Sequence, residues 1–528
     1  MTHELMASTL IGFPILSLLI ALPLVAAVIV GVFAKDAWAQ PIALIFSLVQ
    51  LALASVLAWV FRTDTSDMQF VERIGSYHLG IDGISVFFIP LTALLACLTM
   101  LTSEASAKKG AIGGYLAAVL VFEAFMVGAF AAADTALFVL FFLLEVIPSW
   151  YLITRYGTGD QARQAAQHYV FAMLAAGLLI ATGLFLFGSA AGPDGAFSTD
   201  MSELLANRLP ADQQTLAFFI LLLGLAIKAP LFPFHAWMPR VLEQGPVVGM
   251  SVFLVGIKLG SYGMMRFLVP LAPDAVVQWW WVPVCLGVVS MVYGALIALV
   301  QVDLRRLLAF GSVSHMGVVM LGLFSLNFSG FQGALLQMMS LGMTGAGLYF
   351  LAGFLHSRIG HSRIVPGANL GQVLPGLALA FLVIGLAGVG MPGTSGFNGE
   401  HLVIIGAYKM HWSMAVATGL GTVLGAAYFL SYYQRAFMSE GNQRVGSMPD
   451  LNAREKLIAL SITAVILWVG LYTTPFLRAM APSLATIEKR ITMATPAPPL
   501  AEGTAPANPS SAGPSSPGPS GTGPKEHP

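Results

Sequence analysis

Long apolar runs recur along most of this chain, and this feature constrains the fold more than any other. Runs of about 18 or more apolar residues are long enough to cross a bilayer as helices. Only 9% of the residues are charged, against about 25% in soluble domains. We therefore predict an all-α polytopic integral membrane protein with about fourteen transmembrane helices. They are expected near residues 10–34, 41–61, 80–101, 112–131, 133–153, 166–188, 215–239, 246–266, 279–301, 308–325, 331–354, 373–407, 413–435 and 456–476.

Charge and motifs exclude several classes of function. Lys and Arg total 25, as do Asp and Glu, so the net charge indicates no nucleic-acid or acidic partner. The two cysteines, Cys97 and Cys285, lie far apart in apolar runs and are predicted to pack in the core. The chain has no P-loop, convincing dinucleotide fingerprint, metalloprotease helix or nucleophile elbow. No cofactor or metal is therefore expected in this chain itself.

The basic residues indicate an orientation, because Lys and Arg accumulate on the cytoplasmic side. The odd-numbered connections carry 14 of them and the even-numbered ones 5. Both termini are therefore predicted to be periplasmic, in the inner (plasma) membrane of a bacterium. The first apolar run, from Leu10 to Ala34, exceeds the roughly 7–15 apolar residues of a signal peptide and is predicted to be a retained helix.

Two interrupted runs suggest internal repetition. The seventh predicted helix is broken after Lys228 by Pro230, and the twelfth by the run Gly390–Gly396. The breaks are five helices apart, and an odd interval reverses direction across the membrane. This spacing predicts two inverted five-helix repeats, helices 4–8 and 9–13, with broken helices 7 and 12. The predicted divisions are 1–110 (helices 1–3), 111–270 (first repeat), 271–440 (second repeat), 441–493 (helix 14 and the following segment) and 494–528, a disordered tail with 10 prolines.

Five titratable residues inside apolar runs are the main functional candidates, because ionisable groups at bilayer depth are costly. Each also has a structural alternative. Glu145 could be a neutral, hydrogen-bonded carboxyl, and Lys228 or Lys258 could make a static ion pair. His315 could be a satisfied core histidine, and Glu400 could cap a half-helix. Together the five groups on successive helices predict a proton or cation relay.

Four further polar residues rank lower. For Glu123 and His235, local hydrogen bonding to backbone is as good an explanation as function. Asp82 and Asp303 lie at predicted helix starts, where the helix dipole favours a carboxylate, and are expected to be structural. The small residues of Gly421–Gly425 are predicted to allow close helix packing.

Five motifs together resemble one known family, and they occur in order between about residues 75 and 440. They are GIDGIS (80–85), IKAPLFPFHAWMP (227–239), GIKLGSYGMMRF (256–267), DLRRLLAFGSVSHMG (303–317) and GMPGTSGFNGE (390–400). The combination is similar to the M-type, antiporter-like subunits of respiratory complex I, the proton-pumping NADH:quinone oxidoreductase.

The resemblance implies a fold, a function and partners. That family has fourteen helices and two inverted repeats, and its relay residues fall on Glu145, Lys228, Lys258, His315 and Glu400. It implies that the chain moves protons without a redox centre of its own. NADH, FMN, iron–sulfur clusters and quinone are expected elsewhere in the complex, and the partners are other membrane-arm subunits and the lipid bilayer.

The chain departs from the family pattern at several positions. After the tryptophan-x-proline, the family's Asp-Ala-His-x-Glu-Ala-Pro is replaced by Arg240 to Pro246. Leu341 stands where helix 11 usually carries a histidine. We therefore expect ordered water between His315 and Glu400, with His401 as a further titratable group nearby.

Two other functions stay open. A subunit of a cation/proton antiporter or membrane-bound hydrogenase would share the lysines, although Glu400, where many such relatives have lysine, favours the M-type subunit. A non-pumping membrane scaffold is favoured only by the departures at 240–244 and Leu341. Proton uptake and sodium dependence in proteoliposomes would separate these functions.

Overall fold

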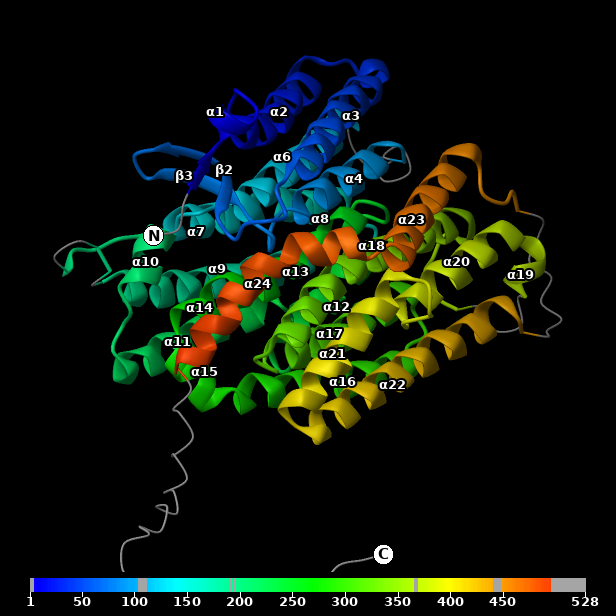
Figure 1. Ribbon diagram of the computed structural model, residues 1–528. Coiled ribbons are helices and arrows are strands. Elements are labelled where there is room, and N and C mark those ends of the chain that lie inside the picture. Colours follow the sequence, from blue (N-terminus) through cyan, green and yellow to red (C-terminus); the bar gives the residue numbers. More distant parts are fainter. Residues whose placement is uncertain are drawn as a thin grey trace, which may run out of the picture. The chain divides into compact units, whose positions relative to one another are not determined.

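The computed structural model describes residues 4–102, 112–189, 191–192, 195–364, 369–439 and 448–494. The chain up to Ala494 forms one compact unit, in which helices pack around one another (Figure 1). The predicted tail lies outside the described residues from residue 495 onward.

The N-terminal third contains helices and a small sheet. Its elements are β1 (Glu4–Met6), α1 (Ala7–Leu10), α2 (Ile15–Val28) with its π-helical continuation η1 (Ile29–Phe33), α3 (Asp36–Val60), β2 (Met68–Ile74), β3 (Tyr77–Ile81), α4 (Phe88–Met100) and α6 (Ile112–Ala131). The strands form a sheet of order β1-β2-β3, in which β1 is parallel and β3 antiparallel to β2.

The sheet corrects the sequence analysis, which predicted no strands. The predicted helix near 80–101 begins only at Phe88, because residues 77–81 belong to β3. A two-residue turn with Gly75 at a φ of 60° joins β2 to β3, a conformation that glycine adopts without steric cost.

The middle third carries the first helix break. Its elements are α7 (Thr135–Leu144), α8 (Val146–Tyr156), α9 (Ala162–Gly188), α10 (Met201–Ala206), α11 (Ala211–Lys228), the short 3-10 helix η4 (Phe234–Ala236), α12 (Trp237–Gln244), α13 (Met250–Gly263) with its π-helical continuation η5 (Met264–Leu268), α14 (Val269–Leu271) and α15 (Pro273–Trp279). Helix α11 ends at Lys228. The sequence predicted this break, because Pro230 lacks the N–H that would continue the helix.

The last part carries the second break. Its elements are α16 (Trp281–Leu299), α17 (Leu304–Leu323), α18 (Phe328–Ile359), α19 (Leu370–Val373), α20 (Pro375–Gly388), α21 (Ser395–Met410), α22 (Trp412–Phe437), α23 (Ala453–Leu471) and α24 (Thr474–Ala494). The break between α20 and α21 also lies where the sequence predicted it. Gly390 and Gly393 there have positive φ values of 79° and 88°.

In the described part of the chain, 11 helices are long and apolar enough to span a membrane, or 12 if the bent pair α23 and α24 is one span. The apolar helices α4 and α20 are shorter. Each of the fourteen predicted segments contains one of the described helices. Helix α24 was not predicted, and it bends by 67° from α23. The division into inverted repeats stays a prediction.

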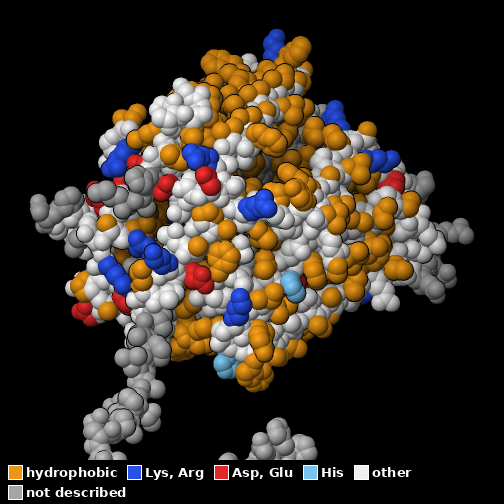
Figure 2. Space-filling view, in the orientation of Figure 1, with side chains coloured by type: hydrophobic (Ala, Val, Ile, Leu, Met, Phe, Trp, Pro, Cys, Tyr) orange, Lys and Arg blue, Asp and Glu red, His pale blue; other side chains and the backbone are white. Residues whose placement is uncertain are grey.

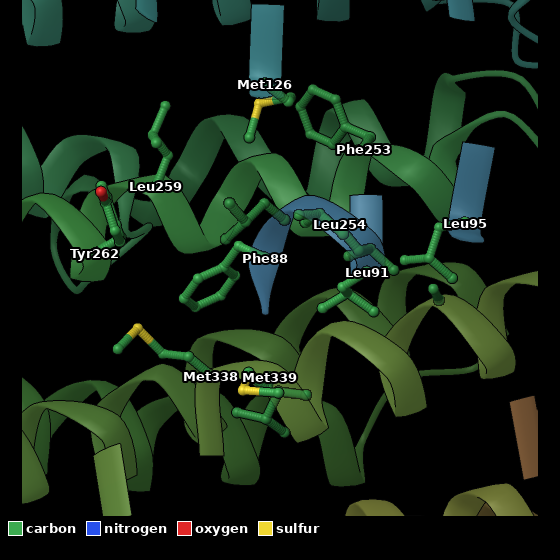
Figure 3. Close-up of a cluster of buried hydrophobic side chains, with 14 of the residues drawn as sticks. Phe88, Leu91, Leu95, Met126, Phe253, Leu254, Leu259, Tyr262, Met338 and Met339 are labelled. Carbon is green, nitrogen blue, oxygen red and sulfur yellow. The ribbon is translucent and has the colours of Figure 1, made fainter. Parts of the chain in front are cut away.

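Helix α13 lies at the centre of the bundle. All its residues are buried. The Tyr262 ring centroid lies 5.9 Å from that of Phe88 of α4, and the Ser261 hydroxyl lies 2.9 Å from the Met338 sulfur of α18. Phe253 lies beside Met126 of α6 (Figure 3). A charged side chain on this helix is therefore surrounded by protein.

Hydrophobic side chains cover much of the face seen in Figure 2, with charged side chains scattered among them. Cys97 is buried as predicted, but Cys285 is exposed on α16. Its prediction as a core residue was wrong, because an apolar run does not reveal which helix face meets lipid.

Candidate functional site

Glu145 and Lys228 form an ion pair at the first helix break. Their side chains are 0% and 1% exposed. The Tyr169 hydroxyl donates to both carboxylate oxygens at 3.0 Å, and the Ser149 hydroxyl donates to Oε2 at 3.1 Å. The Lys228 ammonium also lies 5.1 Å from the Phe142 ring centroid. Both oxygens of Glu145 are thus hydrogen-bonded within the protein, and one of them also contacts Lys228.

The local sequence explains why the lysine lies here. Lys228 is the last residue of α11, where the helix dipole favours a cation. The break frees backbone carbonyls, and buried carbonyls need donors. The indole N–H of Trp237 satisfies one of them, donating to the Ile227 carbonyl at 2.9 Å.

Lys258 lies on α13, which packs closely against the end of α11. A Cβ on Gly260 would be only 2.5 Å from the Ala229 nitrogen, so glycine is required for this approach. The Lys258 ammonium is within 3.6 Å of the Met316 sulfur, and no ion pair to it is found among the described residues. The static-ion-pair alternative therefore fails for Lys258.

A small cavity adjoins Lys258. It offers about 40 Å³ to the centres of water molecules, and His315, Leu341, Thr344 and Tyr428 are among the residues that line it. One water needs roughly 10–15 Å³ by this measure, so the cavity has room for a short water chain. Leu341, the position that lacks the family's histidine, faces this space.

Helix α22 contacts both His315, which lines the cavity, and Glu400. The hydroxyl of Tyr428 on this helix lies 2.9 Å from His315 Nε2, and Thr422 on the same helix bonds to Glu400. The Glu400 carboxylate accepts hydrogen bonds from Gln337 Nε2 at 3.3 Å and from the Thr422 hydroxyl at 3.2 Å.

Two expectations around Glu400 need correction. Glu400 does not cap α21: it lies in the second turn of a helix that begins at Ser395, and its printed partners are side chains of other helices. His401 is exposed and stacks on Phe397. It adds no titratable group beside Glu400, because consecutive helix residues point about 100° apart.

The lower-ranked residues divide into two kinds. Asp303 caps α17 by accepting from the Arg306 N–H, and Asp82 accepts from the Ile84 N–H and pairs with Arg266 at 2.6 Å. Asp303 thus lies at a helix start, as predicted. Asp82 does not, because α4 begins only at Phe88; it stabilises the turn after β3 instead.

Glu123 and His235 are different. Neither oxygen of the fully buried Glu123 has a hydrogen-bond partner among the described residues, nor does His235 Nδ1. The predicted local capping is therefore not made by either side chain. Gly421 packs as predicted, since a Cβ there would be 2.1 Å from the Met291 sulfur.

Sequence reasoning missed the polar partners of the titratable groups, which are Ser149, Tyr169, Gln337, Thr422 and Tyr428. A tyrosine in an apolar helix gives no signal of its own, because its ring is compatible with the core. Gln337 could have been found, since an amide inside the run GALLQMMS is costly unless it is hydrogen-bonded.

No group of three or more His, Cys, Asp or Glu side chains in the described residues could hold a metal ion. The arrangement consists of buried proton-exchanging groups, hydroxyls and one small cavity. Groups of these kinds can bind and release protons.

Comparisons with known families agree with this chemistry. The family described as NADH:quinone oxidoreductase/Mrp antiporter, TM, matches residues 132–425. The family described as NADH-ubiquinone oxidoreductase chain 4, amino terminus, matches residues 17–129.

Individual relatives match over nearly the whole chain. NADH-quinone oxidoreductase subunit M of Rickettsia bellii (strain RML369-C) is 32% identical over 488 residues, which cover 89% of this chain and 97% of the relative. NADH-ubiquinone oxidoreductase chain 4 of Marchantia polymorpha is 32% identical over 447 residues, covering 82% and 89%.

Two solved structures share the fold. A chain of respiratory complex I from Thermus thermophilus with bound NADH has a TM-score of 0.82 at 29% identity, covering 90% of this chain and 99% of that chain. A chain of the Mrp complex from Dietzia sp. DQ12-45-1b has a TM-score of 0.80 at 21% identity, covering 91% and 98%. The second likeness concerns the fold alone.

Proposed function

Because the chain belongs to the family of NADH-quinone oxidoreductase subunit M (chain 4), we propose that it is a proton-translocating subunit in the membrane arm of such a complex. It carries no redox centre of its own in this proposal, and the electron-transferring groups belong to partner subunits. The observation that supports this function most directly is the buried Glu145–Lys228 pair at a helix break.

The relay begins at this pair. A carboxylate beside Lys228 stabilises the protonated ammonium. When the carboxylate is protonated or moves away, an unpaired ammonium at bilayer depth becomes costly. Lys228 then loses its proton, and Lys258 on the tightly packed neighbouring helix receives it.

From Lys258 the path continues through the water-sized cavity to His315 and then to Glu400. The cavity lining supports this order, since Lys258 and His315 both border it. On α22, Tyr428 bonds to His315 and Thr422 bonds to Glu400. Ordered water replaces the titratable side chain that Leu341 lacks.

The pair provides the test. In the assembled complex, Glu145→Ala and Lys228→Ala should each abolish proton translocation, and the double variant should be no worse than either single one, because both remove the same interaction. His361→Gln, at an exposed loop histidine, is the control and should translocate normally. Wild-type translocation by assembled Glu145→Ala would rule out the relay.

An antiporter subunit is the alternative, supported by the fold shared with the Mrp chain. Sodium-dependent exchange in proteoliposomes would favour it. We also propose that both termini are periplasmic; a reporter fused at Met1 and another in the tail should give matching periplasmic signals, and a cytoplasmic tail would contradict the orientation.

A further inference from the structure

A polar hollow lies beside the first repeat, on the side predicted to be cytoplasmic. It has a volume of about 590 Å³ and lies between the α8–α9 connection, α9, α12 and the start of α17. Its charged or titratable lining residues are Asp160, His168, Arg240, Glu243 and Arg306. Outside the lining, Asp303, Arg305 and Arg363 also act electrostatically on Glu243.

His168 contacts Arg240 in this hollow. The guanidinium Nη1 of Arg240 lies 3.2 Å from His168 Nδ1. Arginine only donates hydrogen bonds, so Nδ1 is the acceptor in this contact. A proton can bind Nδ1 only when Arg240 moves away, and the two cations then repel each other.

The hollow provides partners for a displaced Arg240. Asp160 and Glu243 both line it, and Glu243 is only loosely paired, with its Oε2 3.9 Å from Arg306 Nη1. With His168 neutral, the two carboxylates balance the two guanidinium groups. Protonation of His168 adds one positive charge, which a shift of Arg240 toward a carboxylate accommodates.

The hollow is joined to the buried ion pair by two helices. Tyr169 follows His168 on α9 and donates to Glu145. Trp237 lies one turn before Arg240 on α12, and its ring centroid is 5.5 Å from that of Tyr169. Helices α9 and α12 are therefore linked by two contacts. The His168–Arg240 contact lies at the hollow, and the Tyr169–Trp237 contact lies toward the bundle interior.

We propose that this hollow is the proton-intake site of the chain and that His168 is its proton-collecting residue. Arg240 and the incoming proton occupy His168 Nδ1 in turn. This inference rests on the proposed function of Glu145 and Lys228. A proton from water binds His168 Nδ1 as Arg240 leaves it. His168 then gives up one proton by way of the Tyr169 hydroxyl, which passes its own proton to the Glu145 carboxylate and takes the new one in its place. Protonated Glu145 releases Lys228, and Arg240 returns to the imidazole.

The first test uses the complete complex in proteoliposomes, with proton translocation measured as a function of pH. His168→Ala should lower the translocation rate at least about tenfold, since positioned acid–base groups contribute roughly a hundredfold or more. Added imidazole should restore it, because the hollow is large enough to admit the free ring. His361→Gln is the control, and imidazole should have no effect on it.

The second test changes the partner of His168. Arg240→Gln removes a positive charge beside His168 and makes its protonation easier. The limb of the pH–rate profile that depends on His168 should therefore move to higher pH. His168→Gln, which keeps an acceptor for Arg240 but binds no proton, should lose that limb and should not respond to imidazole.

The outcomes separate this inference from the proposed function. A wild-type rate and pH profile in both His168 variants, with Glu145→Ala inactive, would overturn the intake site and leave the relay standing. Wild-type translocation by Glu145→Ala would overturn the relay itself. A loss in His168→Ala that imidazole does not restore, together with an unshifted profile in Arg240→Gln, would reduce His168 to a structural residue and overturn the intake site.

Discussion

The two helix breaks hold their carboxylates in different ways. At the first break, Glu145 faces the ammonium of Lys228. At the second, Glu400 accepts hydrogen bonds from two neutral groups, Gln337 and Thr422, and no cation pairs with it among the described residues. The first carboxylate is thus compensated by a charge, and the second only by dipoles.

This difference assigns different tasks to the two breaks. A buried ion pair is strongly destabilised when one partner is removed, by about 3–5 kcal/mol, so its protonation state is tied to the position of the other partner. A carboxyl with neutral donors can gain or lose a proton without leaving a partner charge unpaired. The first break is therefore suited to switching, and the second to accepting a proton and releasing it.

The largest expected effect distinguishes function from stability at the two breaks. Glu145→Gln and Glu400→Gln should both block proton translocation, because each removes a carboxyl that must bind a proton. Only Glu145→Gln leaves a buried ammonium without its carboxylate, so it should also lower the yield or thermal midpoint of the complex. Equal thermal midpoints of the Glu145→Gln and Glu400→Gln complexes would show that only one of the two carboxylates being paired with a cation makes no difference to stability.

A smaller effect is expected at the cavity between the breaks. Leu341→Phe should fill the space of about 40 Å³ beside Lys258 and His315, expel its water and reduce translocation by roughly tenfold or more. Leu341→His should be tolerated, since it supplies a titratable group. Leu341→Met conserves volume and is the control. Unchanged translocation in Leu341→Phe would exclude the water route.

The next smaller effect is expected from the backbone at the second helix break. A Cβ at Gly390 would be 2.4 Å from Glu400 Oε2, whereas one at Gly393 would meet only Leu471 at 3.6 Å. Both glycines have positive φ, so alanine at either should cost about 1 kcal/mol of stability. Only Gly390→Ala should also reduce translocation several-fold. An equal loss in Gly393→Ala would attribute the effect to backbone strain.

The smallest effect is expected at a carboxylate outside both breaks. Burial raises the pKa of Asp200, but hydrogen bonds from His78 and Ser202 and the charge of His78 lower it more, so this pKa lies below its usual range. The resulting stability is present above the unfolded pKa of about 3.9 and is lost as the pH falls through the folded pKa.

Asp200→Asn tests this assignment. Its thermal midpoint should fall less than that of the wild type between about pH 6 and about pH 3, while its translocation at neutral pH should be unchanged. A loss of translocation would extend the functional region to the strand that carries His78.

Much of the fold followed from the sequence. Each predicted apolar segment contains a helix, and both breaks lie at the predicted Pro and Gly residues, because bilayer length and missing backbone donors act locally. The strands and α24 did not follow. Pairing of β1 with β2 joins residues more than sixty positions apart, so no local pattern predicts it. Helix α24 is too polar for its sequence alone to predict a membrane-spanning helix.

The sequence by itself determined which titratable groups are buried at bilayer depth, since Glu145, Lys228, Lys258 and Glu400 stand out by their cost in apolar runs. Only the tertiary structure decided what faces them. It paired Glu145 with Lys228, gave Glu400 the neutral partners Gln337 and Thr422, and turned His401 outward. The physical reason is that the apolar residues around a charge in the sequence already show that it is buried. The groups that pair with it come from other helices, and only packing sets how those helices are rotated about their axes.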